Sequence, residues 1–259
     1  MYESIEKEIM IEKHFGCSIN DIARNVIISP VWPLSGFIER AESIVKEFKG
    51  WYKGVTLIYK EKPITVISSG IGAPMTGDCV IALGYSDCKN IFFSGSAGAI
   101  NNKLNFGDIL ICSNAVIGEG FSRYHMEDMQ RDCFGQTALG CDELAQVLFQ
   151  QSVPIAHSLG VAVHRGKIFS TDSILGENKK SFNFMIQKGC DGVEMEVSAV
   201  FTAAEAIGRN AAALITISDL PLKHRSLFHG TEEDDEKCYK NTAKMLPRIL
   251  LEAAALNDM

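Results

Sequence analysis

The sequence predicts an α/β fold: a single domain with a central mixed β-sheet flanked by helices. Short apolar runs rich in β-branched residues alternate along the chain with longer amphipathic segments, as in βαβ units. Clusters of glycine and other small residues directly follow two of these runs, and sheets of this kind bind ligands beyond the carboxyl ends of their strands. A chain of 259 residues is long enough to bury one large core.

Composition narrows the class of protein. The chain is 46% hydrophobic and 22% charged, which is ordinary for a globular domain. Its net charge of −7 argues against nucleic-acid binding, which needs a basic face. The N-terminus lacks the pattern of a signal peptide and no apolar run has transmembrane length. We therefore expect a cytoplasmic protein with no membrane partner.

The eight cysteines are scattered along the chain, and no two of them are spaced as CxxC. Several lie within apolar runs, as Cys112 does. This pattern is typical of reduced, mostly buried thiols rather than of disulfides or a zinc site. We expect no metal site and no cofactor.

Residues 1–24 are predicted to form a helical extension that precedes the α/β domain of residues 25–259. Apolar residues within positions 2–14, among them Ile5, Ile9 and Met10, recur at helical spacing. Ser18 can cap a second short turn. The extension could serve as a lid, an oligomer contact or a packing arm, and the sequence leaves the choice open.

Strands and helices are expected to alternate after residue 25. Strand patterns cover residues 26–28, 55–59, 64–67, 91–93, 108–113, 161–163, 166–169 and 213–217. Helical patterns cover residues 34–49, 74–85, 141–150, 178–187, 197–208 and 235–256. Lys60-Glu61-Lys62-Pro63 is the expected turn between the second and third strands. The acidic run at 232–236 suits the start of the last helix, where the helix dipole favours negative charge.

Two clusters of small residues are candidate parts of a binding site. Gly70 and Gly72 follow a predicted strand, but Met75 stands where a dinucleotide fingerprint needs its third glycine. Their backbone N–H groups could approach an anion or a sugar, or the glycines could simply permit a tight turn. Gly95-Ser96-Ala97-Gly98 follows another strand, and Ser96 adds a hydroxyl donor.

Carboxylates and their neighbours are the other candidates. In an extended stretch, Glu194 and Glu196 share one face and Met195 points to the other. The pair could accept hydrogen bonds from the vicinal hydroxyls of a sugar, or could be ordinary surface charge. Asp219 ends a buried strand. It could be a proton donor with a raised pKa, or it could cap the turn before Pro221.

Taken together, these motifs resemble the nucleoside phosphorylase-I family, which includes purine nucleoside phosphorylases, uridine phosphorylases and methylthioadenosine/adenosylhomocysteine nucleosidases. The similarity covers roughly residues 25–255, and a further segment, Glu119 to His125, is similar to a loop of some uridine phosphorylases. The five motifs, in order, are Ser69-Gly70-Ile71-Gly72-Ala73-Pro74, Gly95-Ser96-Ala97-Gly98-Ala99, Asn105-Phe106-Gly107-Asp108-Ile109, Val193-Glu194-Met195-Glu196 and Ser218-Asp219.

The resemblance implies cleavage of the N-glycosidic bond of a nucleoside and gives each motif a role. Asp219 would donate a proton toward N7 of a purine, which favours purines over uridine. Glu194, Met195 and Glu196 would bind the ribose. Phe169 and Ser218 would contact the base. Gly70, Gly72 and Ser96 would belong to the phosphate site, with phosphate as co-substrate. Members of the family are usually homo-oligomers, so we expect at least a dimer.

The chain departs from the family at the nucleophile. Phosphorylases carry a Pro-Gly-Asp-Pro-x-Arg motif after the first strand, but here Val31 replaces the glycine and Ser35 the arginine. Phe93 stands at the position of a second arginine, and an apolar ring cannot replace a guanidinium fork. The candidate replacements are Arg123, Arg165 and Arg225. Nucleosidases carry a glutamate-rich segment after the first strand, yet here Glu39 is the first carboxylate in that region.

Three hypotheses follow, in order of preference. The first is a phosphorylase with a rebuilt anion site, which basic side chains around Ser96 would favour. The second is a nucleosidase, which a carboxylate facing C1′ of the sugar would favour. The third is a non-catalytic nucleoside-binding or storage protein, because fold does not determine function; a cavity blocked by Trp32 or Phe93 would favour it.

Overall fold

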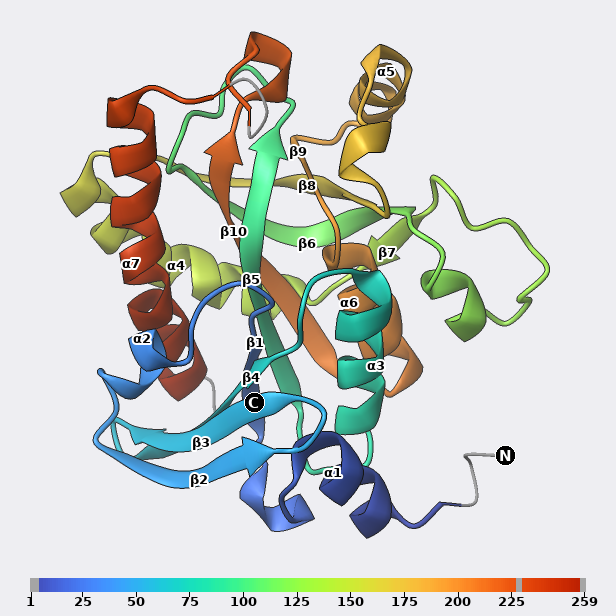
Figure 1. The fold of residues 1–259 in the computed structure, drawn as a ribbon, viewed down its shortest axis with the longest axis vertical. Helices are drawn as coiled ribbons and strands as arrows, with labels where there is room; N and C mark the ends of the chain where they lie inside the picture. The colour runs from blue at the N-terminus through green and yellow to red at the C-terminus, as the bar shows by residue number, and fades with distance from the viewer. Residues whose placement is uncertain (1–4, 227–229, 257–259) are drawn as a thin grey trace.

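The computed structural model describes residues 5–226 and 230–256, and it has the predicted architecture of a mixed sheet flanked by helices (Figure 1). The strands are β1 Asn25–Ile28, β2 Ser43–Lys49, β3 Lys53–Tyr59, β4 Lys62–Ser68, β5 Asn90–Ala99, β6 Ile109–Gly118, β7 Thr137–Leu139, β8 Val163–Thr171, β9 Gly192–Glu194 and β10 Asn210–Asp219. The α-helices are α1 Lys7–Phe15, α2 Ser35–Ile38, α3 Ala73–Leu83, α4 Asp142–Leu159, α5 Lys179–Gln187, α6 Val197–Ala206 and α7 Glu233–Leu256.

The sheet runs in the order β10-β6-β8-β9-β5-β1-β4-β3-β2, with β7 paired to β6. An additional pairing between β10 and β5 closes β5, β10, β6, β8 and β9 into a ring. Parallel pairs, such as β1 with β4 and β5 with β10, occur beside antiparallel ones, such as β6 with β10. The prediction of a mixed sheet is therefore confirmed.

Helices cover the sheet on two sides (Figure 1). One core contains α1, α3 and α6, and the other contains α2, α4 and α7. Because neighbouring side chains of a strand point to opposite faces, Phe93 of β5 belongs to the first core and Phe92 to the second. Both rings are fully buried, so the centre of β5 is packed on both faces.

The prediction of a helix at residues 34–49 is wrong. Only Ser35–Ile38 is helical, and Ser43–Lys49 is strand β2, which pairs antiparallel with β3 from Ser43↔Ile58 to Lys49↔Lys53. The β-branched residues Ile44 and Val45 suit this edge strand. The apolar residues of this segment recur at helical spacing, but pairing with β3 outweighs that preference. The resulting strand is largely exposed.

Other boundaries moved without changing the element type. The strand predicted at 91–93 continues to Ala99, so Gly95 to Gly98 lie within β5 instead of forming a loop. The patterns at 161–163 and 166–169 belong to the single strand β8, and the helix expected to end at residue 150 continues to Leu159. The turn between β3 and β4 is as predicted: Lys60 and Glu61 have φ of 50° and 62°, the left-handed values of a tight hairpin turn.

The N-terminal segment packs into the first core. Its helix α1 buries Ile11 and Phe15, whereas Ile9, expected on the buried side, is 45% exposed. The predicted turn at Ser18 forms as the 3₁₀-helix η2 Ile19–Asp21, in which Asp21 accepts the Ser18 N–H. Residues 2–4 of the predicted helix lie outside the described residues. Packing of α1 against α3 supports the packing-arm interpretation of this segment.

All eight cysteines are free thiols, and six of them are buried, as predicted.

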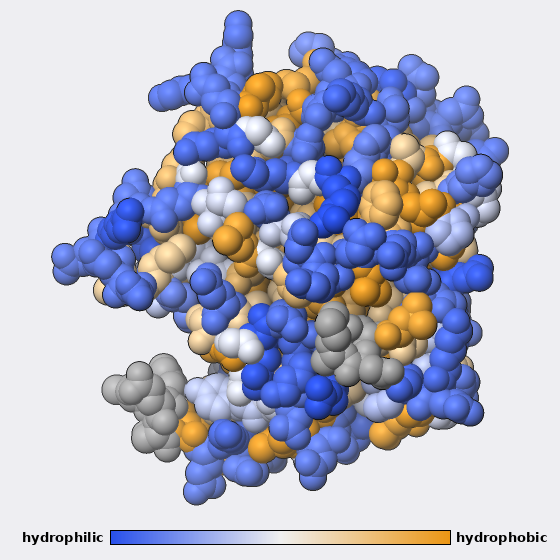
Figure 2. All heavy atoms as spheres, turned by 180° about the vertical axis from the view of Figure 1, so that it is seen from behind, coloured by the Kyte–Doolittle hydropathy of each residue, from blue (hydrophilic) through white to orange (hydrophobic). Residues whose placement is uncertain are grey.

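Seen from behind, the surface is largely hydrophilic, with hydrophobic residues in separate patches (Figure 2). Along residues 5–226 and 230–256, we find no helix with the length and apolar character needed to span a membrane.

Candidate active site

A cavity of about 320 Å³ lies where β5, β9 and β10 end. Its walls include Gly95 to Gly98 of β5, the segment Val193 to Glu196, and Ser218 with Asp219 from β10. Pro30 and Val31 after β1 and the region from Ile174 to Phe182 close the remaining sides. Residues separated by more than a hundred positions thus meet at one edge of the sheet, as expected for this class of fold.

Most of the predicted site residues line this cavity. Ser96, Glu194, Met195, Glu196, Ser218 and Asp219 all do so. Gly70, Gly72 and Phe169 do not, although Ile71 between the two glycines does.

The strands β5 and β10 set the position of Asp219. They pair in parallel, and an irregularity after Ile217 places Asp219 opposite Gly98. A Cβ atom at Gly98 would lie 3.3 Å from Asp219 Oδ2, tighter than most such contacts. Glycine at position 98 therefore leaves room for the carboxyl group at the cavity wall.

Asp219 is only 8% exposed. Its Oδ1 accepts a hydrogen bond from the Ser218 hydroxyl at 2.9 Å. Burial raises the pKa of Asp219, while the Ser218 hydrogen bond acts in the opposite direction. A carboxyl group in such an environment retains its proton to higher pH than an exposed aspartate does.

Glu194, the last residue of β9, and Glu196, the N-cap of α6, both accept hydrogen bonds from backbone N–H groups. Glu194 accepts the N–H groups of Glu196 at 2.6 Å and Val197 at 2.9 Å, together with the Ser170 hydroxyl. Oε1 of Glu196, which is 6% exposed, accepts the Gly72 N–H at 2.6 Å. Burial raises the pKa of both, and the charge of Glu196 adds to the rise at Glu194. These hydrogen bonds hold both side chains in place, while burial favours the protonated form of each carboxyl group.

The glycines predicted for the anion site support Glu196. Gly70 and Gly72 have φ of 81° and 102°, a region that side chains other than glycine rarely adopt. This conformation aims the Gly72 N–H at Glu196. Since that donor is occupied by a carboxylate, it is not available to an anionic ligand in this arrangement.

The aromatic predicted to contact the base lies elsewhere. Phe169 is 3% exposed and packs with Phe134 and Phe184 at ring-centroid distances of 6.1 Å. Its position on β8 turns it into this small cluster and away from the cavity. Ile174 and Phe182, in the segment after β8, supply apolar surface to the cavity instead.

Aromatic residues occupy the region where the family resemblance implies a phosphate site. Phe93 lies in the core at 0% exposure, and Ser35 is exposed at the start of α2. The Trp32 indole donates to Ser94 at 3.3 Å, and its ring lies 6.2 Å from that of Tyr239. Tyr239 hydrogen-bonds Ser96. Neither Trp32 nor Phe93 lines the cavity.

The candidate replacement arginines are not in the cavity. Arg165 pairs with Asp142 at 2.6 Å, and Arg225 pairs with Asp235. Arg123 is exposed. Within the described part of the chain, the lining includes Glu177, Glu194, Glu196 and Asp219 but no lysine or arginine. The cavity therefore has an acidic wall.

Glu177 is the functional candidate that sequence reasoning missed. It follows the 3₁₀-helix η4 Ile174–Gly176, is half-buried, and lines the cavity. Burial and the charge of Asp219 raise its pKa to about 7. A lone glutamate between Gly176 and Asn178 carries no recognisable pattern, so only the fold reveals its proximity to Asp219.

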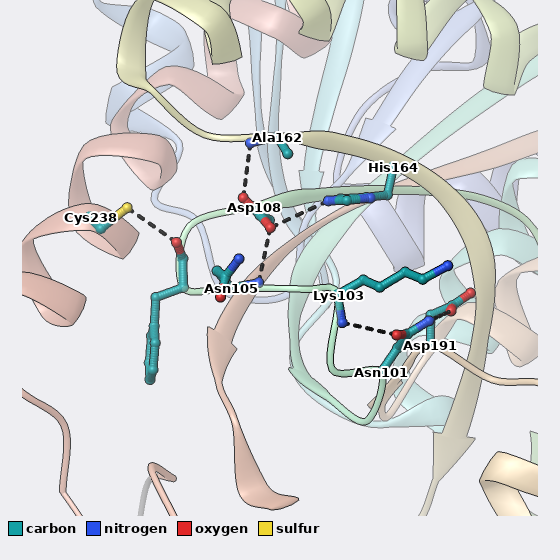
Figure 3. A network of polar contacts seen from close by, with 9 residues as sticks. Asn101, Lys103, Asn105, Asp108, Ala162, His164, Asp191 and Cys238 are labelled. Atoms are coloured by element: carbon teal, nitrogen blue, oxygen red, sulfur yellow. Dashed lines mark hydrogen bonds and ion pairs between the residues drawn. The ribbon is translucent and has the colours of Figure 1, made fainter. Parts of the chain in front are cut away.

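The motif Asn105-Phe106-Gly107-Asp108-Ile109 has a structural role (Figure 3). Asp108 is buried and accepts the N–H groups of Asn105 and Ala162, each at 2.9 Å, and lies 3.3 Å from His164 Nε2. These bonds join the turn before β6 to the start of β8. The motif thus joins β6 to β8 and does not line the cavity.

The segment from Glu119 to His125 is also structural. Buried Glu119 accepts hydrogen bonds from the N–H groups of Phe121 and Ser122 and from the Ser198 hydroxyl. The last of these bonds attaches the segment to α6.

Within the described residues, no group of three or more His, Cys, Asp or Glu side chains is placed to hold a metal ion.

Comparison with known proteins agrees with this architecture. A model of the Phosphorylase superfamily matches residues 37–255. A DeoD-type purine nucleoside phosphorylase of Clostridium novyi is 29% identical over 93% of this chain and 98% of its own. Another from Clostridium beijerinckii is 32% identical over 67% of this chain and 69% of its own.

Solved structures share the fold. A uridine phosphorylase from Vibrio fischeri has a TM-score of 0.77 at 22% identity, covering 98% of this chain and all of its own. A purine nucleoside phosphorylase from Toxoplasma gondii, in complex with immucillin-H, has a TM-score of 0.71 at 24% identity, covering 92% and 93% of the two chains. With the family match spanning most of its length, the chain belongs to the phosphorylase superfamily.

Proposed function

We propose that this protein cleaves the N-glycosidic bond of a nucleoside, with a preference for purines, by phosphorolysis to the free base and ribose 1-phosphate. The observation that carries the proposal is a single cavity lined by a buried acid, Asp219, and by the hydrogen-bonded Glu194 to Glu196 segment. The names of the DeoD-type relatives support both the purine and the phosphate.

In this proposal one part of the cavity binds the ribose and another part protonates the base. Met195 and Glu196 bind the ribose hydroxyls, with Glu194 fixing the segment through its backbone bonds. Asp219, assisted by Ser218, donates a proton toward N7 of the base. Protonation neutralises the charge that develops on the departing base, and general acid catalysis contributes about 10²–10⁴-fold. A carboxylate near the sugar stabilises the cationic character at C1′.

Base release from inosine, adenosine, methylthioadenosine and uridine, each with and without phosphate, tests the proposal. We expect a purine nucleoside to release its base only when phosphate is present. HPLC measures the released base. No release from any of them would contradict the proposed activity and favour a nucleoside-binding or storage protein.

Hydrolysis is a second candidate, and the acidic cavity wall favours it. A phosphate dianion would find no lysine or arginine among the described lining residues to compensate its charge, and an uncompensated charge is costly to bury. Water carries no charge and avoids this cost. Base release at an equal rate without phosphate would establish a nucleosidase.

Replacing Glu196 by alanine tests the ribose site. Hydrogen bonds to a charged group contribute about 1.5–3 kcal/mol, so we expect the Kd for a nucleoside to rise roughly 10- to 150-fold. The Kd for the free base should change little, because the base lacks the sugar hydroxyls. Isothermal titration calorimetry measures both, and Glu205→Ala, at an exposed position of the same helix, is the control. Equal effects on nucleoside and base would contradict the ribose role.

We further propose a cytoplasmic homo-oligomer that acts in purine salvage and binds neither nucleic acid nor membranes. No cofactor is required in this scheme, with phosphate serving as co-substrate. The net charge of −7 supports the absence of nucleic-acid binding. We also propose residues 1–24 as an extension that packs on the α/β domain of residues 25–259, supported by the burial of Ile11 and Phe15.

A further inference from the structure

The Ser96 hydroxyl lies between the cavity and a pair of aromatic side chains. Ser96 lines the cavity and is partly exposed, and its hydroxyl is hydrogen-bonded to Tyr239 of α7. Tyr239 is not among the described residues that line the cavity, although it lies near enough to Asp219 to feel its charge. The Tyr239 hydroxyl therefore reaches the cavity through Ser96.

The alternation of side chains along β5 explains how a residue of α7 reaches Ser96. Phe92 belongs to the core that α7 covers, and side chains two and four residues farther along a strand point to the same face. Ser94 and Ser96 therefore face α7. Ser94 is fully buried, whereas Ser96 lines the cavity. This face of β5 thus changes from packed core to cavity wall at Ser96.

Trp32 packs against the ring of Tyr239. Its indole N–H donates to the Ser94 hydroxyl at 3.3 Å, and its backbone N–H donates to the Ser29 hydroxyl at 2.9 Å. These two bonds anchor the indole on β5 and at the end of β1. Its ring centroid lies 6.2 Å from that of Tyr239, with the planes tilted by 46°. The anchored indole restricts where the Tyr239 hydroxyl can lie.

The hydrogen bond with Tyr239 leaves the Ser96 hydroxyl able to act in the cavity. Thr216 lies opposite Ser96 in β10, but its buried hydroxyl has no hydrogen-bond partner within the described part of the chain, so it does not engage Ser96. Burial raises the pKa of Tyr239, so the phenol keeps its proton and can donate it to Ser96. A hydroxyl donates one hydrogen and accepts others, and Ser96 then has its own hydrogen for a group in the cavity.

The base and the ribose have other partners in the proposed function. Asp219 faces the base, and the segment from Met195 to Glu196 binds the ribose. The Ser218 hydroxyl is bonded to Asp219 at 2.9 Å and to the Ala97 carbonyl oxygen at 3.3 Å. The Ser96 hydroxyl is bonded to neither of these groups. It is therefore available to the third reactant, the nucleophile that attacks C1′.

We propose that Tyr239 is a positioning residue, which holds the Ser96 hydroxyl in the orientation that contacts the nucleophile, and that Trp32 holds Tyr239 in turn. A donor behind Ser96 also strengthens the hydrogen bond that Ser96 makes in front, because linked hydrogen bonds polarise one another. This inference rests on the proposed function and applies to phosphate and to water alike.

Tyr239→Phe tests the inference because it keeps the ring and removes the hydroxyl. We expect kcat, measured at saturating nucleoside and fixed phosphate, to fall about 3- to 10-fold, the effect of one neutral hydrogen bond. The Kd for the nucleoside should stay within about twofold of wild type, because the base and the ribose bind other walls. Ser96→Ala should lower kcat at least as much, since it removes the group that Tyr239 positions.

The double variant separates positioning from general structural support. If Tyr239 acts through Ser96, adding Tyr239→Phe to Ser96→Ala should cause no further loss of kcat, because the effects of residues that act through one contact are not additive. Trp32→Leu removes the ring that packs against Tyr239. It should lower kcat in the wild-type background and have no further effect in Ser96→Ala.

The matched control is Tyr59→Phe. It removes a hydroxyl that also donates to a side chain of α7, Glu252 at 2.9 Å, but lies outside the cavity, so kcat should not change. Wild-type kcat in Tyr239→Phe, or losses that multiply in the double variant, would overturn this inference alone. Absence of base release by the wild-type protein would overturn the proposed function, and the positioning role of Tyr239 with it.

Discussion

Asp219→Asn is expected to lower kcat by about 10²–10⁴-fold, the usual contribution of a general acid. Asparagine has the same shape, and its Oδ1 can still accept the Ser218 hydroxyl hydrogen that Asp219 accepts at 2.9 Å. It cannot deliver a proton to the base. Nucleoside affinity should therefore stay within a few-fold of wild type, so that the loss appears in kcat rather than in KM.

The pH dependence provides a second readout for Asp219. Burial raises the pKa of this carboxyl, so its acid form persists to higher pH than in an exposed aspartate and is lost as pH rises through that pKa. Wild-type kcat should fall on this alkaline side, whereas the residual kcat of Asp219→Asn should stay flat there. Asp87→Asn, at an exposed position, is the control. An unchanged kcat in Asp219→Asn would leave the residue with a turn-capping role.

Phe93→Arg is expected to destabilise the protein severely without creating a phosphate site. Phe93 is fully buried on β5 and pairs with Ile28 of β1 and Ala213 of β10. Loss of a buried phenylalanine ring typically costs about 3–5 kcal/mol, and a buried unpaired charge adds several more. Since domains are stable by only about 5–15 kcal/mol, urea denaturation should show loss of most of the free energy of unfolding.

Phe93→Leu is the matched control, because it keeps an apolar side chain at this position and removes less buried volume than the loss of the whole ring. Phosphate should not rescue the arginine variant. If phosphate instead raised the Tm of Phe93→Arg while leaving wild type unchanged, the guanidinium would have reached the region of Ser96. The region around Ser96 would then be a phosphate site that lacks only its positive charge.

Local sequence was sufficient wherever the determining interactions are local. The turn at Lys60 and Glu61, the helix after Gly72 and the acidic start of α7 were all predicted from neighbouring residues and confirmed. Residues 43–49 were mistaken for helix because their structure depends on β3, and pairing with another strand leaves no signal in the segment itself.

The same distinction applies to the site. The sequence by itself determined the α/β class, the family, and the motifs that supply Ser96, Glu194 to Glu196, Ser218 and Asp219 to one cavity, because each motif is a short stretch of neighbouring residues. Three features depend on the tertiary structure. Phe169 packs away from the cavity, and the Gly72 N–H donates to Glu196. Glu177 lies near enough to Asp219 to feel its charge. Side-chain direction, burial and the charge of distant residues decide these features, and none of them is encoded within a short stretch of chain.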